Sequence, residues 1–305
     1  MNKAIIAMDR SGSFRVYLAV TTTMVEEARQ IHDTTPVATA ALGRVLTAAG
    51  LMGLMLKNTQ DKLTMQFKGD GPAREILATA YGDGRVKGYI SNPQVDLPLK
   101  PNGKLDVGGA IGIGTVTVIK DLGLKEPYVG RIELVNGEIA EDLTAYFFVS
   151  EQQSSSVALG VRVATDLSVA AAGGMIIHML PGADPESVDA LEPLLEQMTP
   201  ISTLVEQVTK ESVGKTEEAV VTELLRRIFE SLPEQFTVKP LETRDLGWEC
   251  DCNEERLEQA LMSIGVTDLK TILDEDGQAE LTCQFCRKKY HFDREHLQKL
   301  LDEMM

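Results

Sequence analysis

The chain carries two stretches, GWECDCNEERLEQAL (residues 247–261) and LTCQFCRKKYHF (residues 281–292), that together hold all four of its cysteines. Residues 1–249 contain no cysteine, although the chain is 305 residues long. In a compartment that keeps thiols reduced, clustered cysteines indicate metal binding or redox chemistry more often than structural disulfides. These two stretches therefore predict a metal site or a redox centre in the last part of the sequence.

The cysteines form two short pairs, Cys250-x-Cys252 and Cys283-x-x-Cys286. A structural zinc site needs four ligands in a tetrahedron, and proteins usually supply them as two pairs of this kind. The sequence around the second pair is typical of a zinc knuckle, a tight turn with two thiols that is followed by a strand. We therefore predict one Zn²⁺ per chain, bound by the four thiolates of Cys250, Cys252, Cys283 and Cys286.

Two histidines follow the second pair and are alternative ligands. Only four residues separate Cys286 from His291, whereas fingers with two cysteines and two histidines leave about 12 between the pairs. We therefore expect His291 and His296 to be an ordinary strand residue and an ordinary helix residue. A thioredoxin-like use of CQFC is also disfavoured, because a strand-like run, and no helix, follows its second cysteine.

Zinc would make this region sensitive to oxidation. About 60 residues bury too little surface to fold stably alone, so metal binding replaces part of the core. Oxidation of the thiolates removes the ligands of the zinc, so the ion should leave and the domain should then unfold. Each short pair can afterwards close on itself, with Cys283–Cys286 less strained than Cys250–Cys252. The basic run at 287–289 is interpreted as a solvated turn that also favours ionised thiols.

The N-terminal sequence and the longest apolar run bear on localisation. Asp9 and Arg10 follow only a few apolar residues, which is too short for the apolar core of a signal peptide. The run AAGLMGLML (48–56) is also far shorter than the roughly 20 residues that span a bilayer. We therefore expect a cytoplasmic protein that has no membrane partner.

Charge divides the chain into three parts. Residues 1–181 contain 17 Lys and Arg against 18 Asp and Glu, residues 182–245 contain 6 against 14, and residues 246–305 contain 7 against 14. The cysteine-bearing part is therefore acidic, which is poorly suited to binding phosphate backbones. This argues against nucleic acid as a partner.

Periodicity predicts an α+β fold in three segments. Residues 1–181 should form a mixed α/β domain with a substantial β-sheet, because strand-like runs such as KAIIAMD and FRVYLAV alternate with the Ala- and Leu-rich helix TPVATAALGRVLTAAGLMGLMLK. The dipeptide Asn136-Gly137 is a strong hairpin signal at the end of a strand. Residues 182–245 should be an amphipathic helical linker, and residues 246–305 a small zinc-binding domain.

The linker contains two helices with apolar stripes, ADPESVDALEPLLEQM and TEEAVVTELLRRIFESLP. Val221, Leu224, Leu225 and Ile228 belong to the second stripe. Neither helix has a hydrophobic cluster of its own, so each must lie on a neighbour. Two interpretations remain open: a helical cap on the first domain, or a detachable linker whose stripes bind something else once they are freed.

Two glycine motifs resemble nucleotide-binding loops. GGAIGIG (108–114) lacks the G-x-G-x-x-G spacing and leads into the strand TVTVI, so a phosphate would find no helix N-terminus there. GKT (214–216) resembles the end of a phosphate-binding loop, but Thr209 stands where the first glycine belongs. Thr216 is better interpreted as the N-cap of a helix with acidic residues in its first turn.

At this point a family resemblance is evident. The C-x-C and C-x-x-C pairs, about 30 residues apart, are similar to those of the 33-kilodalton redox-regulated heat-shock chaperones, and the similarity extends over the whole chain. Four stretches resemble the N-terminal domain of that family: TAALGRVLTAAGLMG, KGDGPAREILATAYGDGRVKGY, GGAIGIGTVTVIKDLGLKEPYVG and AEDLTAYFFVSEQ.

The resemblance implies a chaperone and not an enzyme. Its reduced, zinc-bound form would be inactive. Oxidative stress would form two intramolecular disulfides, Cys250–Cys252 and Cys283–Cys286, release zinc and unfold the C-terminal domain and the linker. The exposed surface would hold unfolding client proteins without ATP, and the active form would be a homodimer. Two alternatives are a zinc-ribbon adaptor that binds nucleic acid or a transcription component, and a thiol oxidoreductase.

Overall fold

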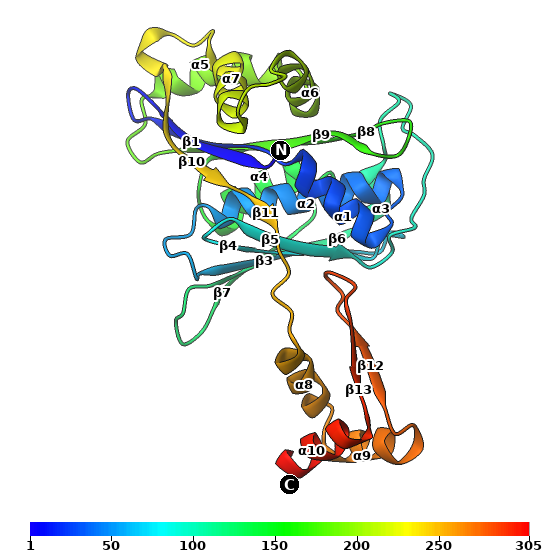
Figure 1. Ribbon diagram of the computed structural model, residues 1–305. Coiled ribbons are helices and arrows are strands. Elements are labelled where there is room, and N and C mark those ends of the chain that lie inside the picture. Colours follow the sequence, from blue (N-terminus) through cyan, green and yellow to red (C-terminus); the bar gives the residue numbers. More distant parts are fainter. Residues whose placement is uncertain (305) are drawn as a thin grey trace. The chain divides into compact units, whose positions relative to one another are not determined.

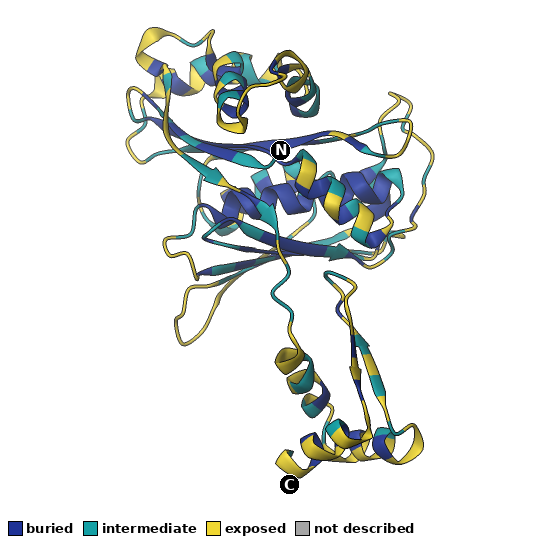
Figure 2. Cartoon of the chain, in the orientation of Figure 1, coloured by how far each residue is buried: buried dark blue, intermediate teal, exposed yellow. Residues whose placement is uncertain are grey.

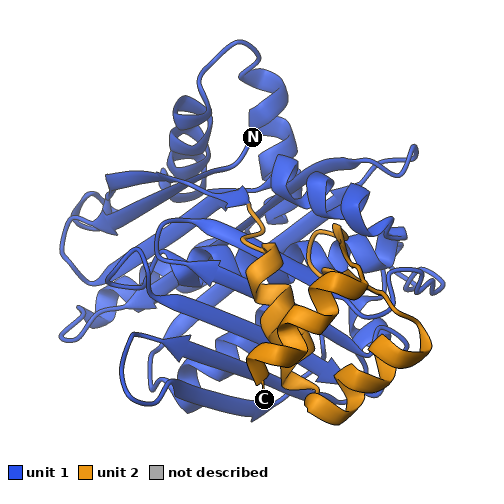
Figure 3. Cartoon of the chain, turned by 60° about the horizontal axis from the view of Figure 1, so that its bottom comes forward, with its two compact units in different colours: residues 1–248 blue, residues 249–305 orange. Residues whose placement is uncertain are grey.

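The computed structural model describes residues 1–304, and the chain divides into two compact units, residues 1–248 and residues 249–305 (Figure 3). Met305, the last residue of the predicted zinc-binding domain, lies outside the described residues. Residues 182–245 therefore share a unit with residues 1–181, and the second unit begins three residues after the predicted start at 246. The mixed α+β class predicted from the sequence is confirmed.

The first unit contains two sheets. The five-stranded sheet has the order β10 (Val238–Asp245), β1 (Lys3–Asp9), β2 (Phe14–Val20), β9 (Val169–Met179) and β8 (Ser155–Val163). The six-stranded sheet has the order β11 (Gly247–Trp248), β5 (Arg85–Ile90), β4 (Glu75–Tyr81), β3 (Lys62–Gly69), β6 (Gly114–Asp121) and β7 (Tyr128–Glu133). Neighbouring strands are antiparallel except for the short pair β11 and β5, which is parallel.

Helix α2 (Pro36–Gly53) lies between the two sheets and contacts both (Figure 1). Pro36 occupies the first turn, where its missing N–H costs no hydrogen bond. The helix is apolar on all sides, as expected of a helix that is covered on all sides, and Figure 2 shows it buried along its length. By length and composition it could cross a membrane, but 89% of its apolar window is buried inside the protein. It is therefore a core helix.

Shorter helices complete the first unit around this centre. They are α1 (Thr22–His32), α3 (Val107–Ile111) and α4 (Ala140–Ser150). Within GGAIGIG, residues 108–111 belong to the short helix α3, which the sequence did not predict, and the predicted strand follows as β6 at Gly114.

The hairpin predicted at Asn136-Gly137 is wrong. These residues lead from β7 into α4, and β7 pairs with β6 through an earlier turn. The carboxylate of Asp142, in the first turn of α4, accepts hydrogen bonds from the backbone N–H groups of Val135, Asn136, Gly137 and Ile139. A helix N-terminus, and not a second strand, therefore holds the turn.

Three helices cover the outer face of the five-stranded sheet (Figure 1): α5 (Pro185–Glu196), α6 (Ile201–Glu211) and α7 (Glu217–Phe229). The Thr216 side chain caps α7 as predicted, by accepting from the N–H of Ala219, and the Asp184 side chain caps α5 by accepting from the N–H of Glu186. The apolar stripe of α7 is buried in one cluster with residues of β1 and β2. The ring centroids of Phe14 and Phe229 lie 6.4 Å apart.

The segment 182–245 is not helical throughout. After the 3₁₀ turn Glu234–Phe236, strand β10 pairs with β1 and forms the edge of the sheet. Most of its side chains are exposed, and Pro240 interrupts its hydrogen-bonding capacity, which restricts such a strand to an edge. The chain then crosses to the other sheet as β11, whose pairing is limited to Gly247 with Arg85 and Trp248 with Val86. The link to the second unit is thus short, and Leu246 within it is buried in the core of the first unit.

The second unit consists of α8 (Glu254–Ser263), α9 (Val266–Glu275), the hairpin of β12 (Ala279–Thr282) and β13 (Lys289–Phe292), and α10 (Arg294–Met304). Its core is a small cluster that includes Leu269, Phe292, Leu297 and Cys283, and the other three cysteines pack against it. A core of this size contributes little stability of its own, so a bound metal would add a large share of it.

Candidate metal centre

The second cysteine pair lies on the turn between β12 and β13. The N–H of Cys283 donates to the carbonyl of Lys288 at 2.9 Å, and the N–H of Arg287 donates back to the carbonyl of Cys283 at 2.9 Å. Arg287 adopts a left-handed backbone with φ of 61°, which is uncommon for a residue other than glycine. This turn places the thiols of Cys283 and Cys286 on the same side of the hairpin, as the knuckle pattern predicted.

The first pair lies in the extended segment before α8. Asn253 caps that helix by accepting from the N–H of Arg256 at 2.9 Å, and Arg256 in turn forms an ion pair with Asp251 at 2.6 Å. The residues on both sides of Cys252 are therefore tied to the first turn of α8. This fixes the segment Cys250–Cys252 next to the hairpin.

The four sulfurs converge. Each lies within 4.8 Å of the other three, with 3.7 Å between the Sγ atoms of Cys250 and Cys283 and 3.3 Å between those of Cys252 and Cys286. Four sulfurs at about 2.3 Å from a tetrahedral zinc would be separated by about 3.8 Å. The donor set and its spacing therefore fit a metal ion held by four cysteines.

The surroundings disfavour the ionised form of two of the four thiols. Burial raises the pKa of Cys250 and of Cys286 above the usual thiol value. Burial also acts to raise the pKa of Cys252, but hydrogen bonds, first of all that from Tyr290, outweigh it and the pKa is lowered. Because a metal binds the thiolate form, a divalent cation would supply the charge that stabilises four thiolates here.

Tyr290 contacts the cysteine cluster, although nothing in the sequence singles it out. It is buried on β13, and its hydroxyl lies 3.1 Å from both the carbonyl oxygen and the Sγ of Cys252. The Nζ atom of Lys288 lies 4.8 Å from the centroid of its ring. The sequence shows only that a tyrosine occurs in the strand after the knuckle. It does not show which cysteine the tyrosine hydroxyl contacts.

The two histidines lie in the kinds of element expected for them. His291 is exposed on β13, and His296 is in α10, where its ring contacts Glu258. Within residues 1–304, the group formed by the four cysteines includes neither histidine. In the basic run, Arg287 and Lys288 are exposed and Lys289 pairs with Glu280 at 2.8 Å, which agrees with a solvated turn.

The chain is similar to known proteins over almost its whole length. The family model described as Hsp33 protein matches residues 2–293. The 33 kDa chaperonin of Alkaliphilus oremlandii is 47% identical over 305 residues, covering 100% of this chain and 97% of that protein. The 33 kDa chaperonin of Clostridium tetani is 48% identical over 301 residues, covering 98% of each. The crystal structure of the Hsp33 homologue from Thermotoga maritima superposes with a TM-score of 0.86 at 34% identity, over 99% of this chain and 98% of that one.

Proposed function

The chain belongs to the Hsp33 family, and from this premise we propose that it is a redox-regulated, ATP-independent holdase that is inactive while reduced. The family consists of chaperones, so unfolding proteins are the partners expected. The convergence of four sulfurs within 4.8 Å is the observation that carries the redox part of the proposal. The protein would work in the cytoplasm and form a homodimer when oxidised, without a nucleic-acid or membrane partner.

In the reduced state, Cys250, Cys252, Cys283 and Cys286 would hold one Zn²⁺. When bound, the ion would offset two of the four negative charges and would join the segment before α8 to the hairpin. Two molecules of hydrogen peroxide, together with four protons, would take four electrons from the four thiolates. The products are two disulfides and four molecules of water, which leaves no thiolate ligand for the ion. The second unit would then lose the cross-link that supplements its small core.

The chain itself provides a route from this event to a client surface. Cys250 is two residues from Trp248, the end of the two-residue strand β11, and β11 directly follows the exposed edge strand β10. Unfolding of residues 249–304 would free β11 and then loosen β10 and the helix α7 that contacts it. Release of the segment 182–245 would expose the apolar stripe of α7 and the sheet face beneath it. The light scattering of a thermally unfolding client protein tests this activity. The scattering should be suppressed by the oxidised chaperone and not by the reduced one.

The order of disulfide formation is a first prediction. A Cys-x-x-Cys turn brings its sulfurs together with little change in the backbone, whereas one intervening residue forces a strained ring. Cys283–Cys286 should therefore form first and zinc should leave at that step, followed by Cys250–Cys252 and full chaperone activity. The contacts between sulfurs of different pairs, at 3.7 and 3.3 Å, are edges of a tetrahedron and do not decide the pairing. Mass spectrometry of samples quenched during oxidation measures the order, and a majority of links between the pairs would contradict it.

A second prediction concerns Tyr290. Its hydroxyl withdraws charge from the sulfur of Cys252, so the variant Tyr290→Phe should lose zinc to peroxide several-fold faster. A chromogenic chelator that reports released zinc measures the rate. His291→Gln, which alters an exposed neighbour on the same strand and leaves the hydroxyl in place, serves as the control. Equal rates in Tyr290→Phe and wild type would show that the hydrogen bond has no protective role.

A further inference from the structure

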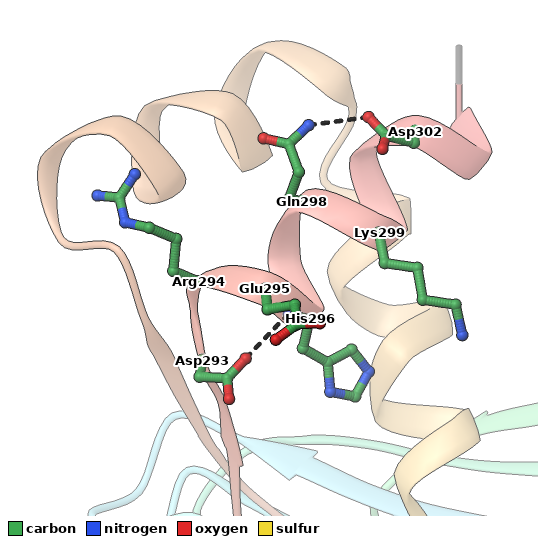
Figure 4. Close-up of a pocket in the computed structure, with 7 residues that line it drawn as sticks. All are labelled: Asp293, Arg294, Glu295, His296, Gln298, Lys299 and Asp302. Carbon is green, nitrogen blue, oxygen red and sulfur yellow. Dashed lines mark hydrogen bonds between the residues drawn. The ribbon is translucent and has the colours of Figure 1, made fainter.

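A second group of ligand-type side chains lies in the second unit, away from the cysteines in the sequence. It consists of Glu254 and Glu258 on α8 and His296 on α10, whose ligand atoms all lie within 4.8 Å of one another. The Nε2 atom of His296 lies 2.6 Å from a carboxylate oxygen of Glu258, and its Nδ1 atom lies 3.7 Å from one of Glu254. Figure 4 shows the ring of His296 pointing from α10 toward α8.

The sequence places the two carboxylates on one face of α8. Residues four apart on a helix are neighbours, and two like charges there repel each other and destabilise the helix. Among the ion pairs of residues 1–304, His296 is the one basic partner of either Glu254 or Glu258. The pair therefore brings two negative charges to a site where the imidazole supplies at most one positive charge.

The imidazole is held in place by its surroundings. The backbone N–H of His296 donates to Oδ1 of Asp293 at 2.9 Å, which fixes the first turn of α10. The ring packs edge-on against Phe292, with centroids 5.1 Å apart and planes at 69°, and Phe292 is fully buried. Packing against the buried Phe292 therefore fixes the imidazole ring so that it faces α8.

We propose that Glu254, Glu258 and His296 form a second, sulfur-free site for a divalent first-row metal ion, of which Zn²⁺ is the one to test. Two carboxylates and one imidazole are a ligand set suited to such ions, and water completes the coordination. The side chains are 60%, 27% and 25% exposed, respectively, so the ion and its waters can enter from solvent. His296 also borders a wide, shallow hollow along α10, lined by the residues labelled in Figure 4.

The site would join the first two turns of α8 to the first turn of α10. Carboxylates and imidazole do not react with peroxide as thiolates do, so this cross-link would not be a direct target of the oxidant. By mass action, free zinc would then add to the stability of the second unit without altering the thiol chemistry. The inference does not depend on the redox proposal, because none of its ligands is a cysteine.

The test uses the reduced full-length protein, first loaded with one equivalent of Zn²⁺ and then titrated with more Zn²⁺ in a calorimeter. Wild type should bind a second, weaker equivalent. Glu258→Gln and His296→Gln should each weaken that second step by about tenfold or more. The matched controls Glu255→Gln and His291→Gln, which alter exposed neighbours on α8 and β13, should leave it unchanged.

Cobalt(II) separates this site from the cysteines. The first equivalent of cobalt bound to apo protein should give the intense near-ultraviolet absorption of sulfur-to-metal charge transfer, and the second equivalent should add none. A wild type that takes up only one equivalent would overturn the proposal. So would a second step of equal strength in His296→Gln and in the controls. In either case the first equivalent would still report on the cysteine site independently.

Discussion

The variant Leu224→Asp should act as a holdase even when it is fully reduced and loaded with zinc. Leu224 is completely buried in the stripe of α7 that packs on the five-stranded sheet. An unpaired carboxylate at this position costs about 4 kcal/mol or more, which is enough to detach a helix held mainly by apolar contacts. The expected result is suppression of client aggregation under reducing conditions, together with protease cleavage within residues 182–245.

Thr222→Asp is the matched control, because it adds the same charge two residues away on the exposed side of the same helix. It should stay inactive and resistant to protease while reduced. If Leu224→Asp behaves like this control, the segment 182–245 is a passive cap on the sheet and the coupling proposed above is wrong. Activity in both variants would point to added charge, and not to release of the stripe, as the cause.

The variant Cys283→Ser should lose tight zinc binding and unfold the second unit while residues 1–248 remain folded. Zinc in structural sites contributes about 10–16 kcal/mol of binding free energy to folding, and the small core of this unit offers little to replace it. Zinc analysis and limited proteolysis of the reduced protein measure both effects. Removal of zinc from reduced wild type by a strong chelator should produce the same cleavage pattern.

Thr282→Ser controls for the Cys283 substitution, since it introduces a serine at the exposed neighbouring position. It should keep one zinc per chain and a protease-resistant second unit. Cys283→Ser protein that retains full zinc affinity would exclude Cys283 as a ligand. A second unit that stays folded without zinc would instead show that its apolar core is sufficient.

The parts of the fold that could be predicted are those whose pattern reflects burial or chemistry directly. The cysteine spacing identified the four sulfurs that converge, because two short pairs leave few other arrangements. The cap at Thr216 and the core helix at Pro36–Gly53 were predicted because local sequence decides them.

Other features depend on tertiary contacts that local sequence does not reveal. Strand β10 was missed because its sequence VKPLETRD is polar and contains Pro240, and it forms a strand only because β1 offers an edge. Asn136-Gly137 was assigned to a hairpin, but Asp142 accepts its amides. The role of Tyr290 follows from the register of β13 relative to Cys252, 38 residues away.

Zinc release and client aggregation can be followed in the same samples during oxidation by peroxide, which links the metal to the activity in a single experiment. One bound zinc per chain and no suppression of aggregation are expected at the start. Zinc release should then be followed by suppression, and reductant with added Zn²⁺ should reverse both. Suppression that arises while zinc is still bound would show that zinc release does not control the activity. So would complete oxidation and loss of zinc that bring no suppression.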